Sequence, residues 1–169
     1  MKTMSLLGLL AIVGGVGGAG YAEFDRITTN DRTAKEHVFQ LTRAYIKDRD
    51  IAAAAASSAV KKCVSELHFI EFPPVLTSFL TDNAIVEYEI VRKYGSKAHQ
   101  QKHEVEDMRN ALSAEYYDLI DEELDELDPQ HLKRTLQVMR EYNGNRKEMS
   151  RCIHKNAYQA LRAQGALES

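Results

Sequence analysis

The sequence predicts an all-α fold, in which an N-terminal hydrophobic signal or anchor helix precedes an antiparallel bundle of five or six helices, one of them long. Six of the nine glycines lie within the first 22 residues, so glycine and proline rarely interrupt the rest of the chain. Between these interruptions, apolar residues recur three and four positions apart, as they do on the buried face of a helix. Tryptophan is absent and 28% of the residues are charged, which also favours a helical domain over an aromatic-rich β fold.

Residues 4–22, MSLLGLLAIVGGVGGAGYA, form an uncharged stretch that follows Lys2. As a signal peptide, this stretch has Lys2 at its positive end and the small residues of Gly20-Tyr21-Ala22 at the cleavage site. As a retained membrane helix, it reaches the roughly 18 residues needed to span a bilayer. Gly14 and Gly18 then have the four-residue spacing that lets two membrane helices pack closely. Both interpretations stay open, and both place the rest of the chain across a membrane.

These interpretations define the expected domains and location. Residues 1–22 are the signal peptide or membrane anchor, residues 23–30 a linker, and residues 31–169 one helical domain. If the leader is kept, the protein is anchored in a membrane through residues 4–22, with its C-terminal domain outside the cytoplasm. If the leader is cleaved, the protein is soluble and either periplasmic or secreted.

Capping residues and the few remaining glycines and prolines mark the expected helix boundaries. Thr33 with Glu36 fits a capping box, and Asp50 is the expected cap of the second helix. Asp128 precedes Pro129 as a cap residue precedes a first-turn proline. The expected helices run from about 31 to 47, 50 to 70 and 74 to 94, then from a Ser96 cap through Leu127, from Pro129 to Gly144, and from about Met149 to Gly165.

The fourth expected helix is the longest and carries a continuous apolar seam with the three- and four-residue steps of a packed or coiled-coil helix. Residues 97–104, before the seam, have no apolar face and are expected in solvent. In the preceding helix, residues 86–90 alternate with period two like a strand. No partner run with a hairpin turn accompanies them, so we expect helix there too. The seam residues are Val105, Met108, Leu112, Tyr116, Leu119, Ile120, Leu124 and Leu127.

The two cysteines, Cys63 and Cys152, are predicted to form a disulfide if the chain is exported. An even cysteine count behind an export signal is typical of disulfide-bonded proteins. The bond would close a loop of roughly 90 residues, for which the chain-entropy model gives about 4–5 kcal/mol of stabilisation. In a cytosolic chain, the same residues would instead be two buried free thiols.

His99 and His103 are four residues apart, so on a continuous helix they share a face and could hold one divalent metal ion. The glutamate that follows the first histidine of a zinc-protease helix is missing, because position 100 is glutamine. Two ligands make a weak site, so a third is needed from elsewhere, such as His68 or His154. The alternative is that both histidines lie on an exposed polar turn.

An acidic run between Arg109 and Lys133 is the clearest candidate for partner binding, since no lysine or arginine interrupts it. Carboxylates at the C-terminal end of a helix oppose the helix dipole. They either pair with the basic residues of the last two helices or meet a basic surface on a protein partner. The run lacks the alternating ligands and central glycine of a calcium loop. The residues expected at the partner surface are Asp118, Asp121, Glu122, Glu123, Asp125 and Glu126.

Other classes of function have less support in the sequence. A formal net charge of −3 argues against nucleic-acid binding. No glycine-rich phosphate loop, nucleophile elbow or CxxC pair indicates catalysis, and no cofactor is expected apart from a divalent metal at the histidines. We therefore expect a non-enzymatic, exported or membrane-anchored interaction protein, such as an adaptor, an inhibitor or an assembly component of an envelope complex. It would bind a protein partner through its long helix and acidic end. The alternative is a small-ligand or metal-binding carrier that uses His99 and His103.

Overall fold

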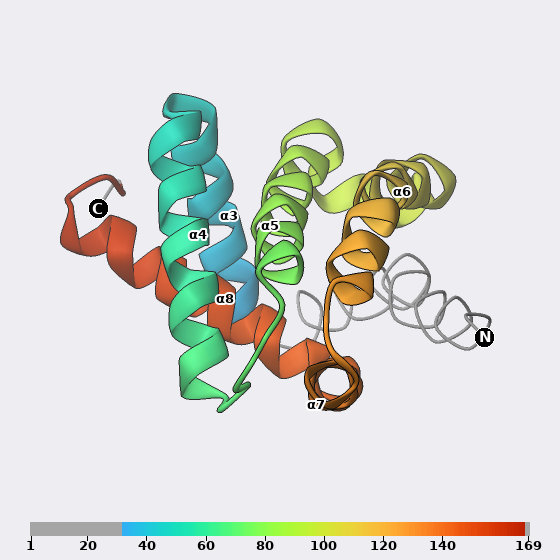
Figure 1. Ribbon diagram of the computed structural model, residues 1–169. Helices are drawn as coiled ribbons and strands as arrows, with labels where there is room; N and C mark the ends of the chain where they lie inside the picture. Colours follow the sequence, from blue (N-terminus) through green and yellow to red (C-terminus); the bar gives the residue numbers. More distant parts are fainter. Residues whose placement is uncertain (1–31, 168–169) are drawn as a thin grey trace.

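The computed structural model describes residues 32–167, and in this range it contains six α-helices, one 3₁₀ helix and no β-strand (Figure 1). The all-α prediction is therefore confirmed for this part of the chain. The hydrophobic segment 4–22, with Gly14 and Gly18, lies outside the described residues. No helix within 32–167 is both long and apolar enough to cross a membrane. The elements are α3 (Arg32–Lys47), α4 (Arg49–Glu66), α5 (Pro74–Tyr94), the 3₁₀ helix η2 (Gly95–Gln100), α6 (Lys102–Asp125), α7 (Pro129–Gly144) and α8 (Arg146–Ala163).

The helices pack as two connected groups around α5. Helices α3 and α4 lie side by side, and α8 crosses both of them, making its broadest contact with α4 (Figure 1). Helix α5 stands between the α3–α4 pair and α6 (Figure 1). Helix α6 contacts α5 and η2, and α7 contacts α8. The long helix α6 thus packs mainly along one side, against α5.

The alanines of α4 let this helix lie close to its neighbours. Ala52 and Ala56 are completely buried on the face that continues to Cys63, and Ala157 and Leu161 of α8 are buried in the same core. An alanine side chain is a single methyl group, so the backbones of two helices can approach closely across it and still fill the space between them. The alanine run therefore supplies both helix propensity and a slim packing face.

The boundaries of α4 differ from the expected ones. Asp48, rather than Asp50, caps the helix, because its extended backbone points Oδ1 at the amides of Asp50 and Ile51, each 3.1 Å away. The helix ends at Glu66 rather than near residue 70, since His68 has a positive φ of 59° that a helix cannot accommodate. Ile70, at the end of the range expected for this helix, is 77% exposed.

The long fourth helix is also shorter at its start than expected. Gly95 ends α5 with a φ of 52°, a conformation that glycine adopts without steric cost, and η2 follows it. Gln101 then leaves the helical conformation (φ −110°, ψ 44°), so α6 begins at Lys102 and not after Ser96. With 24 residues, α6 is still the longest of the described helices. Leu119, expected in its seam, is 45% exposed because the seam faces a single helix.

Two other features of the helices agree with the predictions from the sequence. Residues 86–90 are helical, within α5, despite their alternating pattern. Asp128 caps α7, and its Oδ1 accepts hydrogen bonds from the backbone amides of Gln130 (2.9 Å) and His131 (3.2 Å). Pro129 occupies the first turn of α7, as predicted.

Candidate functional site

A pocket of about 330 Å³ opens where the end of α6 meets the segment before α5 and the first turns of α7. Most of its wall is apolar, and polar side chains stand around this apolar part. Such a hollow suits one apolar side chain of a partner, with polar or charged groups around it. The apolar lining residues are Phe72, Pro73, Pro74, Leu124 and Leu127, and the polar ones are Glu71, Glu123, His131 and Thr135.

Glu123 holds one wall of this pocket in place. Its Oε2 accepts a hydrogen bond of 2.9 Å from the backbone amide of Val75, in the first turn of α5. The residue at the cap position, Pro73, has no side chain that could accept this bond. A carboxylate at a helix N-terminus also interacts favourably with the helix dipole. Glu123, expected at the partner surface, therefore links α6 to α5, and it remains at the edge of the pocket.

Further acidic residues lie in the second half of α6 and at its C-cap, Glu126, in the same stretch of chain as the pocket-lining Glu123 and Leu127. Glu115, Asp118, Glu122 and Glu126 are exposed. Within residues 32–167, no lysine, arginine or histidine nitrogen lies within 4.0 Å of their carboxylates. Pairing with the basic residues of α7 and α8 therefore does not account for these four charges. Of the remaining two predicted residues, Asp121 is half-buried and Asp125 is exposed.

The α7 side of the pocket carries its own ion pairs. Asp128 pairs with His131 Nδ1, and this hydrogen bond, together with those from the backbone amides, holds the pKa of Asp128 below its ordinary value. Arg134 Nη1 lies 3.4 Å from Glu71 Oε1, which joins α7 to the segment before α5. One basic residue of α7 thus pairs outside the acidic run.

A buried ion pair, which the sequence patterns did not predict, fixes α6 against α5. Arg109 donates from Nε and Nη2 to the two carboxylate oxygens of Glu87, at 2.7 and 2.8 Å, and both side chains are buried. Nearby, Tyr116 of α6 donates its hydroxyl proton to Asp82 of α5, and burial with this carboxylate raises the pKa of Tyr116. The signal for the ion pair was Arg109 itself, four residues after Val105 and thus on the seam face.

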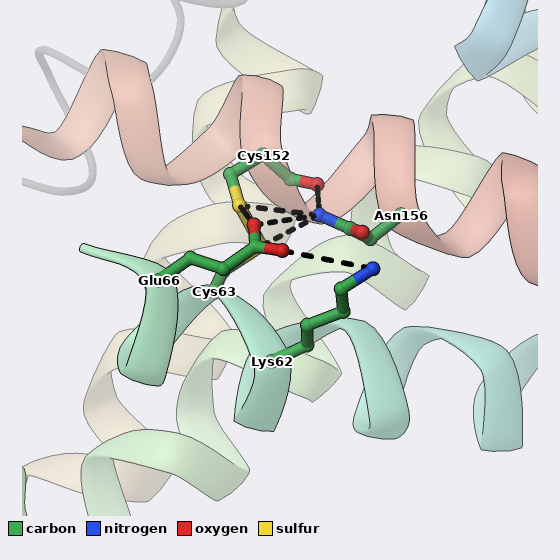
Figure 2. Close-up of polar contacts among 5 residues, drawn as sticks. All are labelled: Lys62, Cys63, Glu66, Cys152 and Asn156. Carbon is green, nitrogen blue, oxygen red and sulfur yellow. Dashed lines mark hydrogen bonds and ion pairs between the residues drawn. A yellow bond between two sulfur atoms is a disulfide. The ribbon is translucent and has the colours of Figure 1, made fainter. Parts of the chain in front are cut away.

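The structure brings the sulfur atoms of Cys63 and Cys152 to disulfide-bonding distance, joining α4 to α8, with Cα atoms 5.8 Å apart (Figure 2). Cys63 is completely buried, and Cys152 is half-buried. Two polar side chains converge on the sulfurs. Asn156 Nδ2 lies 3.3 Å from Cys152 Sγ and 3.4 Å from Cys63 Sγ, and Glu66 Oε2 lies 3.4 Å from Cys152 Sγ.

Sequence reasoning found the cysteines but missed these two neighbours. Glu66 is three residues after Cys63, and Asn156 is four residues after Cys152. Helical spacing of three or four puts each on the same face as its cysteine, so the predicted helices contained the signal. Among residues 32–167, the group of metal-ligating side chains close enough to share one ion is Cys63, Glu66 and Cys152.

The two predicted metal ligands, His99 and His103, lie in different elements. His99 is in η2 and His103 is in the first turn of α6, with non-helical Gln101 between them. The shared helical face on which the prediction depended is therefore interrupted. Both side chains are exposed, and metal binding by this pair stays a prediction.

His154, considered as a third ligand, is instead a core residue of α8. It is 3% exposed, its Nδ1 has no hydrogen-bond partner among the described residues, and its ring lies 6.1 Å from that of Tyr88 in α5. Burial, followed by the nearby charge of His37, lowers the pKa of His154 to about 4. The hydroxyl of Tyr88 is also buried, with no hydrogen-bond partner in the part of the chain that the structure describes, and burial raises the pKa of Tyr88. His154 is therefore neutral at pH 7.

The chain was compared with protein-family models, with curated proteins and with solved structures. None of the three comparisons found a match.

Proposed function

We propose that this chain is a non-enzymatic, exported or membrane-anchored interaction protein that binds a basic segment of a protein partner at the acidic end of α6. The observation that carries the proposal is that the exposed carboxylates of Glu122 and Glu126 have no ion-pair partner within residues 32–167 and are adjacent in sequence to Glu123 and Leu127, which line an apolar pocket. A charge that the fold itself does not compensate, next to a hollow lined by apolar side chains, is suited to an amphipathic ligand.

The two parts of this surface have different roles in binding. An apolar side chain of the partner enters the pocket beside Phe72 and Leu127, which removes apolar area from water. Lysine or arginine residues on the same segment then face the carboxylates of α6. Such exposed charge pairs add modest affinity, but they speed association and select basic partners over acidic ones.

The hydrophobic leader supports the location in this proposal. Residues 4–22 are uncharged and follow a lysine, as in a signal peptide or an N-terminal anchor. Mass spectrometry of the native protein tests this part. An N-terminus at Glu23, or an intact chain in the membrane fraction, is expected; an intact chain in the cytosolic fraction would contradict export and anchoring.

The surface can be tested with two synthetic helical peptides that share a leucine and phenylalanine face and differ in their polar face. One polar face is lysine and the other is glutamate. We expect the lysine peptide to bind the protein in a fluorescence-anisotropy titration, and added salt to weaken this binding. Glu122→Gln with Glu126→Gln should weaken binding roughly two- to tenfold, because two exposed charge pairs are lost.

The matched control removes the same charge from the other end of α6. Glu104→Gln with Asp107→Asn also neutralises two exposed carboxylates, but neither of these residues lines the pocket. This variant should bind the lysine peptide as the unmodified protein does. Equal loss in both variants, or equal binding of the two peptides, would show that the protein has no specific surface for basic segments.

A further inference from the structure

The carboxylate of Glu66 lies against the sulfurs of Cys63 and Cys152, and its Oε2 also accepts a hydrogen bond of 3.4 Å from Asn156 Nδ2. Glu66 lies one helical turn after Cys63, and its Oε2 is 3.4 Å from Cys152 Sγ (Figure 2). A sulfur in a disulfide carries no proton, so this oxygen receives no hydrogen bond from it. The ligand atoms of the three residues lie within 4.8 Å of one another. Two thiolates and a carboxylate are ligands that Zn²⁺ binds in proteins.

We propose that, once the disulfide is reduced, Cys63, Cys152 and Glu66 bind one Zn²⁺ ion, with water as the fourth ligand. A dithiol reductant donates two electrons and two protons. The S–S bond breaks, each sulfur gains a proton, and the reductant closes its own disulfide. Zn²⁺ then forms two Zn–S bonds as both thiol protons pass to solvent. The disulfide and the zinc site therefore exclude each other, because both use the same two sulfur atoms.

The geometry requires little movement of the helices. At a Zn–S distance of about 2.3 Å, tetrahedral ligation needs the two sulfurs about 3.8 Å apart. Their Cα atoms are already held 5.8 Å apart by the packing of α4 against α8. Cys63 is completely buried, whereas Cys152 is half-buried, so the proposal assigns the movement that separates the sulfurs to the Cys152 side chain. The Glu66 side chain is 48% exposed, which gives the ion a route from water.

The surrounding charges and hydrogen bonds suit a site of this kind. Two thiolates, one carboxylate and Zn²⁺ carry a net charge of −1. Lys62 Nζ lies 3.6 Å from Glu66 Oε1, the oxygen that does not face the sulfurs, and offsets this charge (Figure 2). Asn156 Nδ2 lies within 3.4 Å of both sulfurs, where an N–H donor stabilises thiolate ligands. None of these residues belongs to the proposed partner surface.

The test titrates the full chain with Zn²⁺ against a chromophoric chelator, in the reduced and in the oxidised state. We expect one equivalent of Zn²⁺ to bind the reduced protein and none to bind the oxidised protein tightly. Co²⁺ in place of Zn²⁺ should give a thiolate-to-metal charge-transfer band in the reduced protein alone. Glu66→Gln should lower the Zn²⁺ affinity of the reduced protein about tenfold or more.

Glu148→Gln is the matched control, since Glu148 is an exposed carboxylate one turn before Cys152 that lies outside the cluster. Its affinity for Zn²⁺ should equal that of the unmodified protein. If reduction loosens the fold, circular dichroism still gives a decisive result. Added Zn²⁺ should then restore the helix content of the reduced protein. Absence of zinc binding after reduction, equal binding in both redox states, or equal affinities of the Glu66 and Glu148 variants would overturn the proposal.

Discussion

Helices α4 and α8 meet through alanines and a pair of cysteines at disulfide-bonding distance, whereas α5 and α6 meet through a buried ion pair and a tyrosine–carboxylate hydrogen bond. At the first contact, Ala56, Ala157 and Cys63 are all completely buried. At the second, the completely buried side chains include a charged one, Arg109. The two contacts thus hold their helices together in different ways: the first by close apolar packing around a cysteine pair, the second by directional polar bonds.

The difference follows from how many neighbours each helix has. Helix α4 contacts α3, α5 and α8, so apolar residues around much of its surface find partners. Helix α6 contacts α5 and η2, which leaves a narrow seam and exposes residues such as Leu119. A bidentate arginine–carboxylate pair accepts only one relative position of its two helices. We infer that Glu87 and Arg109 set the register of α6 on α5, and through it the position of the acidic end.

Breaking the covalent link should have the largest effect on stability. Replacing both Cys63 and Cys152 with alanine should lower the free energy of unfolding by about 4–5 kcal/mol, because the unfolded chain regains the freedom of a long loop. Urea denaturation followed by circular dichroism measures the loss. The unmodified protein in excess dithiothreitol should show a similar fall in its urea midpoint, and an unchanged midpoint in both samples would show that the sulfurs are not bonded in the native protein.

Breaking the buried ion pair should have the next largest effect. Arg109→Met leaves the Glu87 carboxylate buried without its partner, and we expect a loss of about 3–5 kcal/mol in the free energy of unfolding. Adding Glu87→Leu should restore most of this loss, because no uncompensated charge then remains. Thermal unfolding of the two variants measures both effects. If the double variant is as unstable as the single one, the arginine acts through its packing and not through its charge.

An exposed ion pair on the same helix provides the control for that experiment. Lys102 and Glu106 lie one turn apart on α6, with nitrogen and oxygen 3.8 Å apart. Glu106→Gln should change the free energy of unfolding by roughly 0.5 kcal/mol or less, since water screens an exposed pair. A larger change would mean that total charge, rather than burial, determines the effect of substitutions in α6.

His154 of α8 lies against Tyr88 of α5, so it connects the α4–α8 contact with the α5–α6 contact. Because His154 is neutral in the fold, we expect the free energy of unfolding to depend on pH. Its pKa of about 4 in the fold is below the ordinary 6.5, so the unfolded chain takes up the proton first. The stability that depends on neutral His154 is complete above about pH 6.5 and is lost as the pH falls towards 4. The loss is at most roughly 3 kcal/mol.

Urea midpoints of the oxidised protein between pH 7 and pH 4 measure this dependence. His154→Leu should flatten the curve, since the variant has no group to protonate at that position. His68→Asn is the control, because His68 is exposed and asparagine accepts its positive φ. The control should keep the full pH dependence. A His154→Leu curve parallel to that of the unmodified protein would assign the pH dependence to other groups.

The sequence predicted those features that depend on one segment at a time. Periodic apolar residues and sparse glycine and proline predicted the helices, and Asp128 with Pro129 predicted the start of α7, because cap and first turn are adjacent in the chain. The two cysteines were matched because no third cysteine competes for pairing. Helix ends were less predictable: Asp48 and Asp50 are both good caps, and the choice depends on a backbone conformation that the residue types do not determine.

Apart from the cysteine pair, features that depend on two segments were not predicted. Arg109 is a lone charged residue on the apolar face of α6, so it interrupts the periodic apolar pattern. The sequence of α6 does not indicate that the partner of Arg109 is Glu87 in α5. The groups around the disulfide were hidden for the same reason, since Glu66 and Asn156 come from helices far apart in the sequence. Their spacing places each on the same helix face as its cysteine, but the cluster can be recognised only once the fold brings the two sulfurs together.

A smaller effect than that of the buried ion pair is expected for another polar bond between α5 and α6, that of Tyr116 with Asp82. Tyr116→Phe removes the hydrogen bond to Asp82 and leaves a half-buried carboxylate that water can still reach, so we expect a loss of about 1–2 kcal/mol in the free energy of unfolding. Tyr117→Phe is the matched control, because the neighbouring Tyr117 is half-buried with no hydrogen-bond partner among the described residues. Urea denaturation of both variants compares them directly. If Tyr116→Phe matches the control, the Tyr116–Asp82 bond does not help to set the register of α6, which then depends on the Glu87–Arg109 pair and on the bond from the Val75 amide to Glu123.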